Sequence, residues 1–160
     1  MTPLLSKSDD LVENGIVEQA LNFVQRNTRV VVEAQGGRRV ERPAYPPDAL
    51  RECIVNALIH RDYLLTSTDI QLAVYSNRLE IVSPGRLPNG ITPDRMRLGT
   101  RSTRNQLLKD VMRDYRYLEH MGMRIPRKII LGMKEHNGTE PDLIEQDERF
   151  LVRLLAQDPN

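Results

Sequence analysis

This chain of 160 residues has no tryptophan, two phenylalanines and a single cysteine, Cys53. One cysteine excludes an internal disulfide framework, and its position among apolar residues is typical of a small buried side chain in a reducing compartment. No apolar run approaches the ~20 residues of a membrane-spanning helix. The start, MTPLLSKSDD, lacks the basic-then-apolar pattern of a signal peptide. We therefore expect a cytoplasmic protein with no membrane partner.

The sequence also lacks an excess of charge of either sign. Its formal net charge is +1, so nothing in the total demands a nucleic-acid or membrane partner. The hydrophobic content of 39% and the charged content of 28% fit a globular protein, although 4% aromatic residues is a low value. A chain of this length is long enough to bury a real core and fits one domain.

The most informative stretch is the segment Tyr45 to Tyr63, which reads as a helix. Pro46, Pro47 and Asp48 open it, because proline is tolerated in a first turn and an acid favours the amino end. Within it, Glu52, Asn56 and His60 recur every four residues and therefore share one helix face. This polar stripe borders an apolar arc of Leu50, Cys53, Ile54, Ala57 and Leu58. A carboxylate, an amide and an imidazole at the edge of an apolar face indicate a cleft that holds a water or a metal ion.

Local patterns predict the remaining elements. Helical periodicity favours helices over residues 9–27, 93–98, 104–117 and 125–136, and Gly15 need not stop the first of them. Alternating and β-branched residues predict strands over 29–34, 38–44, 69–75, 78–82 and 150–154, with turns at residues 35–37 and 76–77. Three prolines and two glycines between residues 83 and 94 argue against regular structure over 83–92, and the chain breaks again at 137–141.

Together these elements predict an α+β two-layer sandwich, with helices on one face of a mixed, mostly antiparallel sheet. Residues 1–44, a helix and a hairpin, are expected to belong to the same domain as residues 45–155. Residues 156–160 form a polar tail.

Positive charge is concentrated in one part of the chain. Between Arg86 and Lys128 there are eleven basic and four acidic residues. The paired N–H donors of an arginine guanidinium match phosphate oxygens, so this segment, with Arg101 and Arg104, is suited to bind phosphates. The same pattern is typical of a solvated helical surface, and DNA phosphate is an equal target for the basic segment 95–128. Charge alone does not separate these interpretations.

The chain resembles one family in three runs that occur in this order: YPPDALRECIVNALIHRDY, RLEIVSPGRLPNGIT and YLEHMGMRIPRKI. The family is the C-terminal domain of RecG-related ATP-dependent DNA helicases and of AlbA-containing (Schlafen-like) transcriptional regulators. The resemblance covers about Tyr45 to Phe150. It implies the GHKL (Bergerat) ATP-binding fold shared by gyrase, histidine kinases and MutL, and DNA binding by an AlbA-like domain upstream in the full-length protein. No G-x-x-x-x-G-K-[ST] phosphate loop occurs here, so these residues cannot run a helicase motor.

The resemblance also implies a site for ATP and Mg²⁺. Glu52 would be the catalytic residue that polarises the attacking water, and Asn56 would be the magnesium ligand. Physical chemistry agrees, because a carboxylate is a serviceable general base and an amide oxygen is a hard ligand. Nucleotide-binding positions implied by the resemblance or by charge are Asn56, His60, Ser83, Gly85, Gly90, Arg101, Arg104 and Gly122. For His60, a cation at the C-terminus of the helix is the competing interpretation.

Two departures from the family pattern favour a second hypothesis. Ser83 stands where the family pattern has an aspartate for the adenine amino group, and Leu87 replaces a glycine. Arg124 also replaces a glycine, in the lid element that follows Gly122. The alternative is therefore a degenerate, non-catalytic GHKL module that serves regulation, dimerisation or DNA binding. We rank nucleotide binding first and ATP hydrolysis behind it, and a homo-oligomer stays open.

Overall fold

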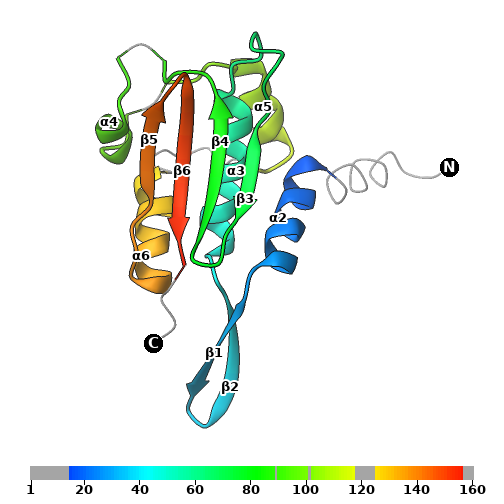
Figure 1. Cartoon of the computed structure of the whole chain (residues 1–160), viewed down its shortest axis with the longest axis vertical. Helices are drawn as coiled ribbons and strands as arrows, with labels where there is room; N and C mark the ends of the chain where they lie inside the picture. Colours follow the sequence, from blue (N-terminus) through cyan, green and yellow to red (C-terminus); the bar gives the residue numbers. More distant parts are fainter. Residues whose placement is uncertain (1–14, 89, 101, 118–124, 157–160) are drawn as a thin grey trace, which may run out of the picture.

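Four strands form one antiparallel sheet in the order β3-β4-β6-β5 (Figure 1). They are β3 (Gln71–Val74), β4 (Arg78–Pro84), β5 (Asp142–Gln146) and β6 (Arg149–Leu155). The computed structural model describes residues 15–88, 90–100, 102–117 and 125–156, and within these ranges every strand pair is antiparallel. Helices cover one face of this sheet, so the predicted α+β two-layer sandwich is confirmed.

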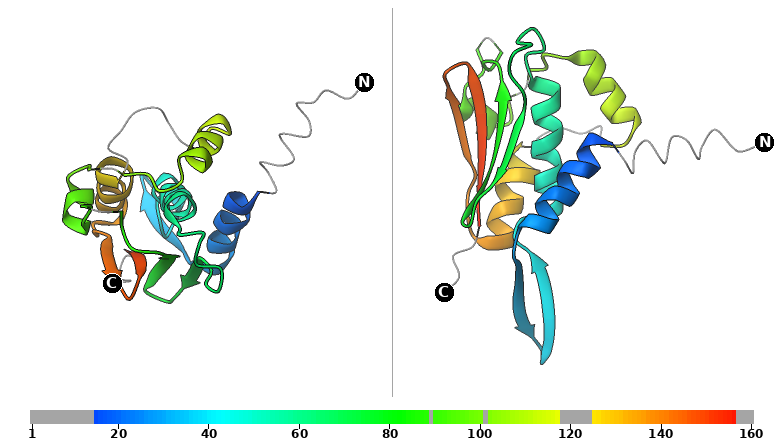
Figure 2. Two further views of the ribbon diagram at one scale, coloured as in Figure 1. Left: turned by 90° about the horizontal axis from the view of Figure 1, so that it is seen from above. Right: turned by 45° about the vertical axis from the view of Figure 1, so that its right-hand side comes forward.

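The helical layer is built around α3 (Pro47–His60), which contacts β4 and most of the other helices. Its partners are α2 (Ile16–Asn27), α5 (Gln106–Asp114), the π-helical η1 (Ile125–Leu131) and α6 (Gly132–Asn137), while the short α4 (Pro93–Arg97) contacts η1 and β5. Figure 2 shows α3 and α6 against the sheet and α2 beside α3. Pro46 caps α3 and Pro47 lies in its first turn, as the sequence predicts.

Strand alternation sends one set of side chains toward the helices. Leu79 and Leu154 lie opposite each other on β4 and β6 and are fully buried. The full burial of a leucine side chain contributes about 1.5–3 kcal/mol. On the other face, Arg153 contacts Glu80 on β4 (Nε to Oε1, 2.9 Å) and Asp142 on β5 (Nη1 to Oδ2, 3.3 Å). The sheet is thus apolar toward α3 and held by cross-strand ion pairs on its open face.

A hairpin of β1 (Val30–Gln35) and β2 (Arg38–Pro43) projects away from the sandwich (Figure 1). Gly36 and Gly37 form its turn with φ values of 57° and 79°. Two central residues with positive φ are what a tight two-residue hairpin requires, and glycine adopts them without steric cost. The predicted hairpin and its turn are confirmed.

Two predicted element boundaries are wrong. The first described helix begins at Ile16, because Gly15 has an extended backbone (φ −68°, ψ 162°); the predicted capping residues before it lie outside the described residues. The segment 83–92 was expected to lack regular structure, yet Ser83 and Pro84 continue β4 and pair with Phe150 and Arg149. Proline is tolerated there because β3 begins opposite Val82 and does not extend alongside Pro84. Pro84 therefore has a strand neighbour on one side only, β6.

Two further features differ from the sequence prediction. The predicted α-helix over 125–136 is π-helical over Ile125–Leu131 and becomes α-helical only in α6. Strand β5 was not predicted at all. Its hairpin turn to β6 is formed by Asp147 and Glu148, with φ values of 50° and 58°. Aspartate is common in such turns, but Glu148 stands where glycine is usual, so the turn signal is weak.

Across the described ranges, the helices are all too short or too polar to cross a membrane.

Candidate functional site

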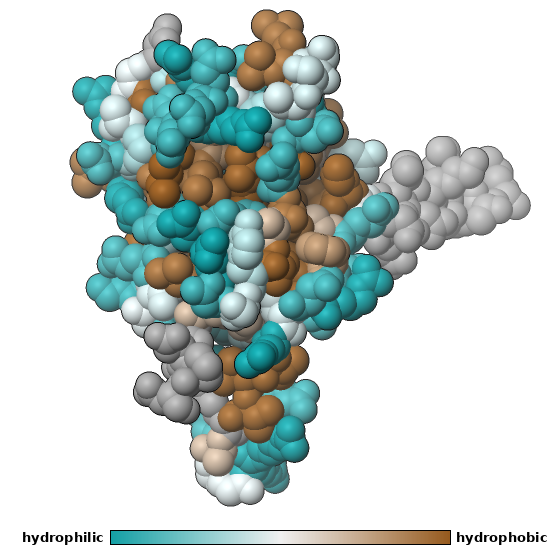
Figure 3. Space-filling view, in the orientation of Figure 1, coloured by the Kyte–Doolittle hydropathy of each residue, from teal (hydrophilic) through white to brown (hydrophobic). Residues whose placement is uncertain are grey.

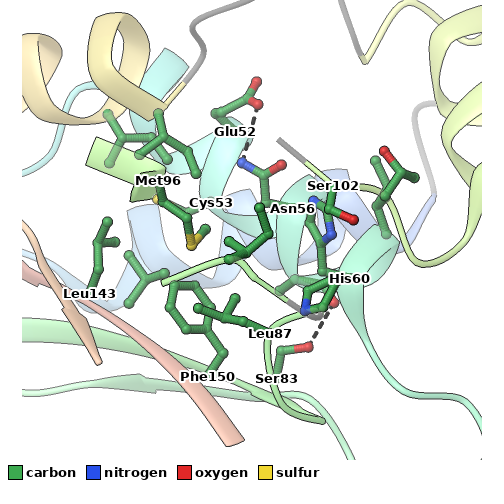
Figure 4. Close-up of a pocket in the computed structure, with 18 of the residues that line it drawn as sticks. Glu52, Cys53, Asn56, His60, Ser83, Leu87, Met96, Ser102, Leu143 and Phe150 are labelled. Carbon is green, nitrogen blue, oxygen red and sulfur yellow. Dashed lines mark hydrogen bonds between the residues drawn. The ribbon is translucent and has the colours of Figure 1, made fainter. Parts of the chain in front are cut away.

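A cavity of about 100 Å³ lies between α3, the sheet and the loop that follows β4 (Figure 4). Ile81, Leu143 and Val152 occupy one row across β4, β5 and β6 and form its floor together with Phe150. Its apolar walls are Leu87, Ile91, Met96, Ile125 and Ile129. An engineered apolar cavity of about 150 Å³ admits benzene, so this space is on the scale of a single aromatic ring.

All three residues of the polar stripe of α3 line this cavity. Glu52 is buried, with 3% of its surface exposed, and Asn56 donates from Nδ2 to Glu52 Oε1 at 3.2 Å. In Figure 4 the amide oxygen of Asn56 points away from Glu52. The amide oxygen of Asn56, a hard ligand, therefore lies one helical turn from the buried carboxylate of Glu52.

The donor set fits a magnesium ion that is held mainly by phosphate and water. Among the described residues there is no group of three or more His, Cys, Asp or Glu side chains that could hold a metal ion by themselves. Mg²⁺ usually keeps several waters and takes only one or two protein oxygens together with substrate phosphates. The oxygen of Asn56 is suited to that limited role.

His60 lines the cavity one turn beyond Asn56. Burial lowers its pKa to about 4, and the positive charges of Lys109 and Arg104 act in the same direction. The imidazole is therefore neutral at neutral pH. This contradicts the interpretation of His60 as a cation at the helix C-terminus, because burial and the nearby positive charges disfavour the protonated form.

Ser83 and Gly85 lie at the end of β4, and both line the cavity. Ser83 is buried, and its Oγ donates to the carbonyl of Ala57 at 2.9 Å, which joins β4 to α3. Gly85 has a φ of 110°, and a Cβ atom there would lie 2.7 Å from the Cβ of Asp62. The amide of Asp62 donates to the carbonyl of Pro84 at 2.8 Å. Only glycine allows this close approach of two backbone segments.

Other predicted site residues are not brought to the cavity. Arg104 does not line it; instead Nη1 contacts Asp62 Oδ2 at 2.7 Å and Nη2 donates to the carbonyl of Arg86. Gly90 does not line it either, and its carbonyl accepts from Arg95 Nη1 at 2.6 Å. Arg101 and Gly122, with Arg124 of the lid element, lie outside the described residues.

Two basic residues that the sequence did not single out line the cavity, Arg86 of the loop after β4 and Lys109 of α5. The Nζ of Lys109 donates to Thr103 Oγ1 at 3.2 Å. Asn105 holds this region to the end of α3, because its Nδ2 donates to the carbonyls of Ile59 (2.6 Å) and Arg61 (2.9 Å). These contacts join residues more than 40 positions apart, so no local pattern could separate Lys109 from its basic neighbours.

Other arginine side chains of the described basic segment are bonded to groups of the chain itself. Arg97 donates to the carbonyl of Pro141 at 2.7 Å, and Arg113 pairs with Asp110 at 3.0 Å. Arg95 and Arg104 are engaged as described above. Structural contacts of this kind hold α4 and the loops in place.

Comparison with known proteins identifies a family and a similar solved structure. The family described as "Putative ATP-dependent DNA helicase recG C-terminal" matches residues 67–154, a segment that contains all but the last residue of the four-stranded sheet and begins after α3. The DIP2311 protein from Corynebacterium diphtheriae has a similar solved structure, with a TM-score of 0.69 and 24% sequence identity. The match covers 97% of this chain and 30% of that one, so it supports the fold alone, and this chain spans less than a third of that protein. No curated protein matches the chain.

The family match covers more than half of the sequence. Over that length the chain carries the sheet, the loop after β4 and the helices α4, α5, η1 and α6, whereas α2 and α3 precede the matched segment. The chain therefore belongs to the RecG C-terminal family of ATPase-like domains.

Proposed function

We propose that this chain is a nucleotide-binding domain that takes ATP together with Mg²⁺. The observation that supports this most directly is the pairing of Glu52 and Asn56 at the edge of an apolar, ring-sized cavity. The apolar part is suited to one ring of an adenine base, whose second ring would extend toward the opening, and the polar α3 face is suited to phosphates. Few other ligand classes combine a flat apolar ring with a metal-bound polyanion.

Each residue at the cavity has a specific role in this proposal. Asn56 would supply an oxygen ligand to Mg²⁺, and Lys109 would face the phosphates as a point charge. Mg²⁺ would supply neutralisation of the phosphate charge. Glu52 is the candidate base for an attacking water, since carboxylates in low-polarity sites are tuned for proton transfer. The apolar floor of Phe150, Val152 and their neighbours would exclude water from the ring.

We place this domain within a longer protein that acts on DNA. The family is named for the C-terminal part of an ATP-dependent DNA helicase, and the solved relative is more than three times as long as the matched segment. Such a protein would be a RecG-related helicase or a transcriptional regulator. Nucleotide binding by this domain would regulate or drive the activity of its other domains.

Isothermal titration calorimetry of ATP, with and without Mg²⁺, tests the proposal. We expect binding that is tighter with Mg²⁺ and that Asn56→Ala reduces to the Mg²⁺-independent level. Asn27→Ala is the matched control, because Asn27 does not line the cavity and its amide donates to the carbonyl of Phe23 at the end of α2. Equal affinity in all four combinations of metal and Asn56 variant would reject the phosphate assignment.

A second variant tests the base pocket separately. Val152→Phe adds a ring to the floor of the cavity, and we expect it to abolish binding of adenosine as well as of ATP. Overpacking costs about 1–3 kcal/mol of stability, so the fold is checked by thermal unfolding of the same sample. Full adenosine binding by folded Val152→Phe protein would place the base elsewhere.

Hydrolysis is tested by turnover rather than by binding. Glu52→Gln keeps the size of this buried side chain and removes its basicity. If the domain hydrolyses ATP, this variant should lose turnover and keep its affinity for ATP. Retained turnover in Glu52→Gln would remove Glu52 from the catalytic role.

A further inference from the structure

The β1–β2 hairpin extends beyond the sandwich, and its outer part has no neighbouring element in the described structure (Figure 1). At its base, His136 Nε2 of α6 lies 2.7 Å from the carbonyl oxygen of Pro43. A two-stranded hairpin without further support is only marginally stable in water. The hairpin is therefore a candidate for completion by another strand.

The two edges of the hairpin differ in chemistry. β2 reads Arg-Arg-Val-Glu-Arg-Pro, and charge and proline are the means by which proteins protect an edge strand from pairing. β1 reads Val-Val-Val-Glu-Ala-Gln, with a single charge. Val30 and Val32 are 51% and 47% exposed, and Figure 3 shows apolar surface on the hairpin. The edge of β1 is thus the unprotected one.

The register of the hairpin identifies which backbone groups face that open edge. Gln35 and Arg38 flank the two-residue turn and so form a hydrogen-bonded pair. In an antiparallel ladder every second pair along the strands is of this kind, and the residues between them direct their N–H and C=O groups outward. On β1, those outward residues are Val30, Val32 and Ala34.

We propose that the β1 edge pairs antiparallel with the β1 edge of a second copy of this chain. Val32 of one copy lies opposite Val32 of the other, and each Val30 lies opposite Ala34. This register uses every outward residue of β1 and forms about six N–H···O bonds. The paired strands carry a stripe of valine and alanine side chains on one face, because these residues alternate to the same side.

Self-pairing is favoured over a foreign strand because β1 is complementary to itself. Its outward residues are symmetric about Val32, and the register brings no two like charges opposite each other. The equivalent pairing of β2 would place Glu41 opposite Glu41 and would lack the N–H of Pro43. Of the two edges of the hairpin, β1 is therefore the one that satisfies a two-fold arrangement.

Disulfide trapping tests this pairing at one residue. Opposite Cα atoms of a hydrogen-bonded pair lie about 5.5 Å apart, within the ~4.4–6.8 Å that a disulfide spans. Val32→Cys should give a covalent dimer under mild oxidation. Val40→Cys is the matched control, since two β2 strands would lie roughly 14 Å apart in the four-stranded arrangement. The native Cys53 is 1% exposed and does not compete.

A backbone variant provides the non-covalent test. Val32→Pro removes an outward N–H and leaves the hydrogen bonds between β1 and β2 in place, so the hairpin should persist. Light scattering after size-exclusion chromatography should show a dimer for the unmodified chain and a monomer for Val32→Pro. A monomer at every concentration, or equal trapping of Val40→Cys, overturns the proposal. Trapping of Val32→Cys to a different protein in cells, without the homodimer, overturns self-pairing and assigns the edge to a foreign strand.

Discussion

The guanidinium of Arg104 is paired with the carboxylate of Asp62, with 2.7 Å between Nη1 and Oδ2. Asp62 follows the end of α3 and packs against Gly85, while Arg104 also holds the carbonyl of Arg86. The pair therefore fixes the loop that forms one wall of the cavity. Arg104, which the sequence favours as a phosphate ligand, is in this structure a residue that positions that loop.

Removing either partner of this pair should loosen the loop and lower stability. We expect Arg104→Gln and Asp62→Asn to show a coupling free energy of about 1–2 kcal/mol in a double-mutant cycle of chemical unfolding. If Arg104 acts only through the loop, both single variants should weaken ATP binding by the same factor. A much larger loss in Arg104→Gln would indicate direct contact with phosphate.

Gly85→Ala should be strongly destabilising, because it adds a clash to an unfavourable backbone conformation. Its Cβ would lie 2.7 Å from Asp62, and its φ is 110°. Gly138→Ala is the control, since Gly138 has a φ of 74° but no heavy atom within 4 Å of the added Cβ. Left-handed strain alone costs about 1–2 kcal/mol. Thermal unfolding should therefore show a clearly larger loss for Gly85→Ala, and equal losses would contradict the contact with Asp62.

His60 should make the protein less stable in acid. Its pKa is lowered from 6.5 to about 4 in the folded state, so between these values the unfolded chain binds the proton more readily. The contribution of His60 to the free energy of unfolding is present in full above pH 6.5 and is lost as the pH falls toward 4. The loss is roughly 3 kcal/mol at most. His60→Gln should flatten this part of the stability profile. Unchanged pH dependence of chemical unfolding in that variant would contradict the burial of a neutral imidazole.

The pKa of His60 should also report on Lys109. Removing the positive charge in Lys109→Met should raise the pKa of His60, because Lys109 is one of the charges that hold it low. The titration of the imidazole protons by NMR measures this shift. Gln106→Met is a suitable control on the same helix, because its amide bonds Asp110 at the exposed surface. A shift of equal size in both variants would indicate a general change in α5.

Helix α3 and the β1–β2 hairpin could be predicted from the sequence, whereas strand β5 could not. The helix and its stripe of Glu52, Asn56 and His60 follow from periodicity, and the β1–β2 turn follows from Gly36 and Gly37, because both signals act between neighbours along the chain. β5 was missed because Glu148 adopts a positive φ at a turn position where glycine is usual, which weakens the turn signal. Strand pairing with β6 supplies what the turn sequence does not indicate.

For the site, the sequence by itself determined which face of α3 is polar and that a loop rich in proline and glycine follows the strand that begins at Arg78. Tertiary structure alone decided that Lys109 lines the cavity and that Arg104 pairs with Asp62. It also decided that the imidazole of His60 is neutral, since that depends on burial. The physical reason is range: helix periodicity and turn conformation depend on adjacent residues, whereas ion pairing and desolvation depend on residues that only folding brings together.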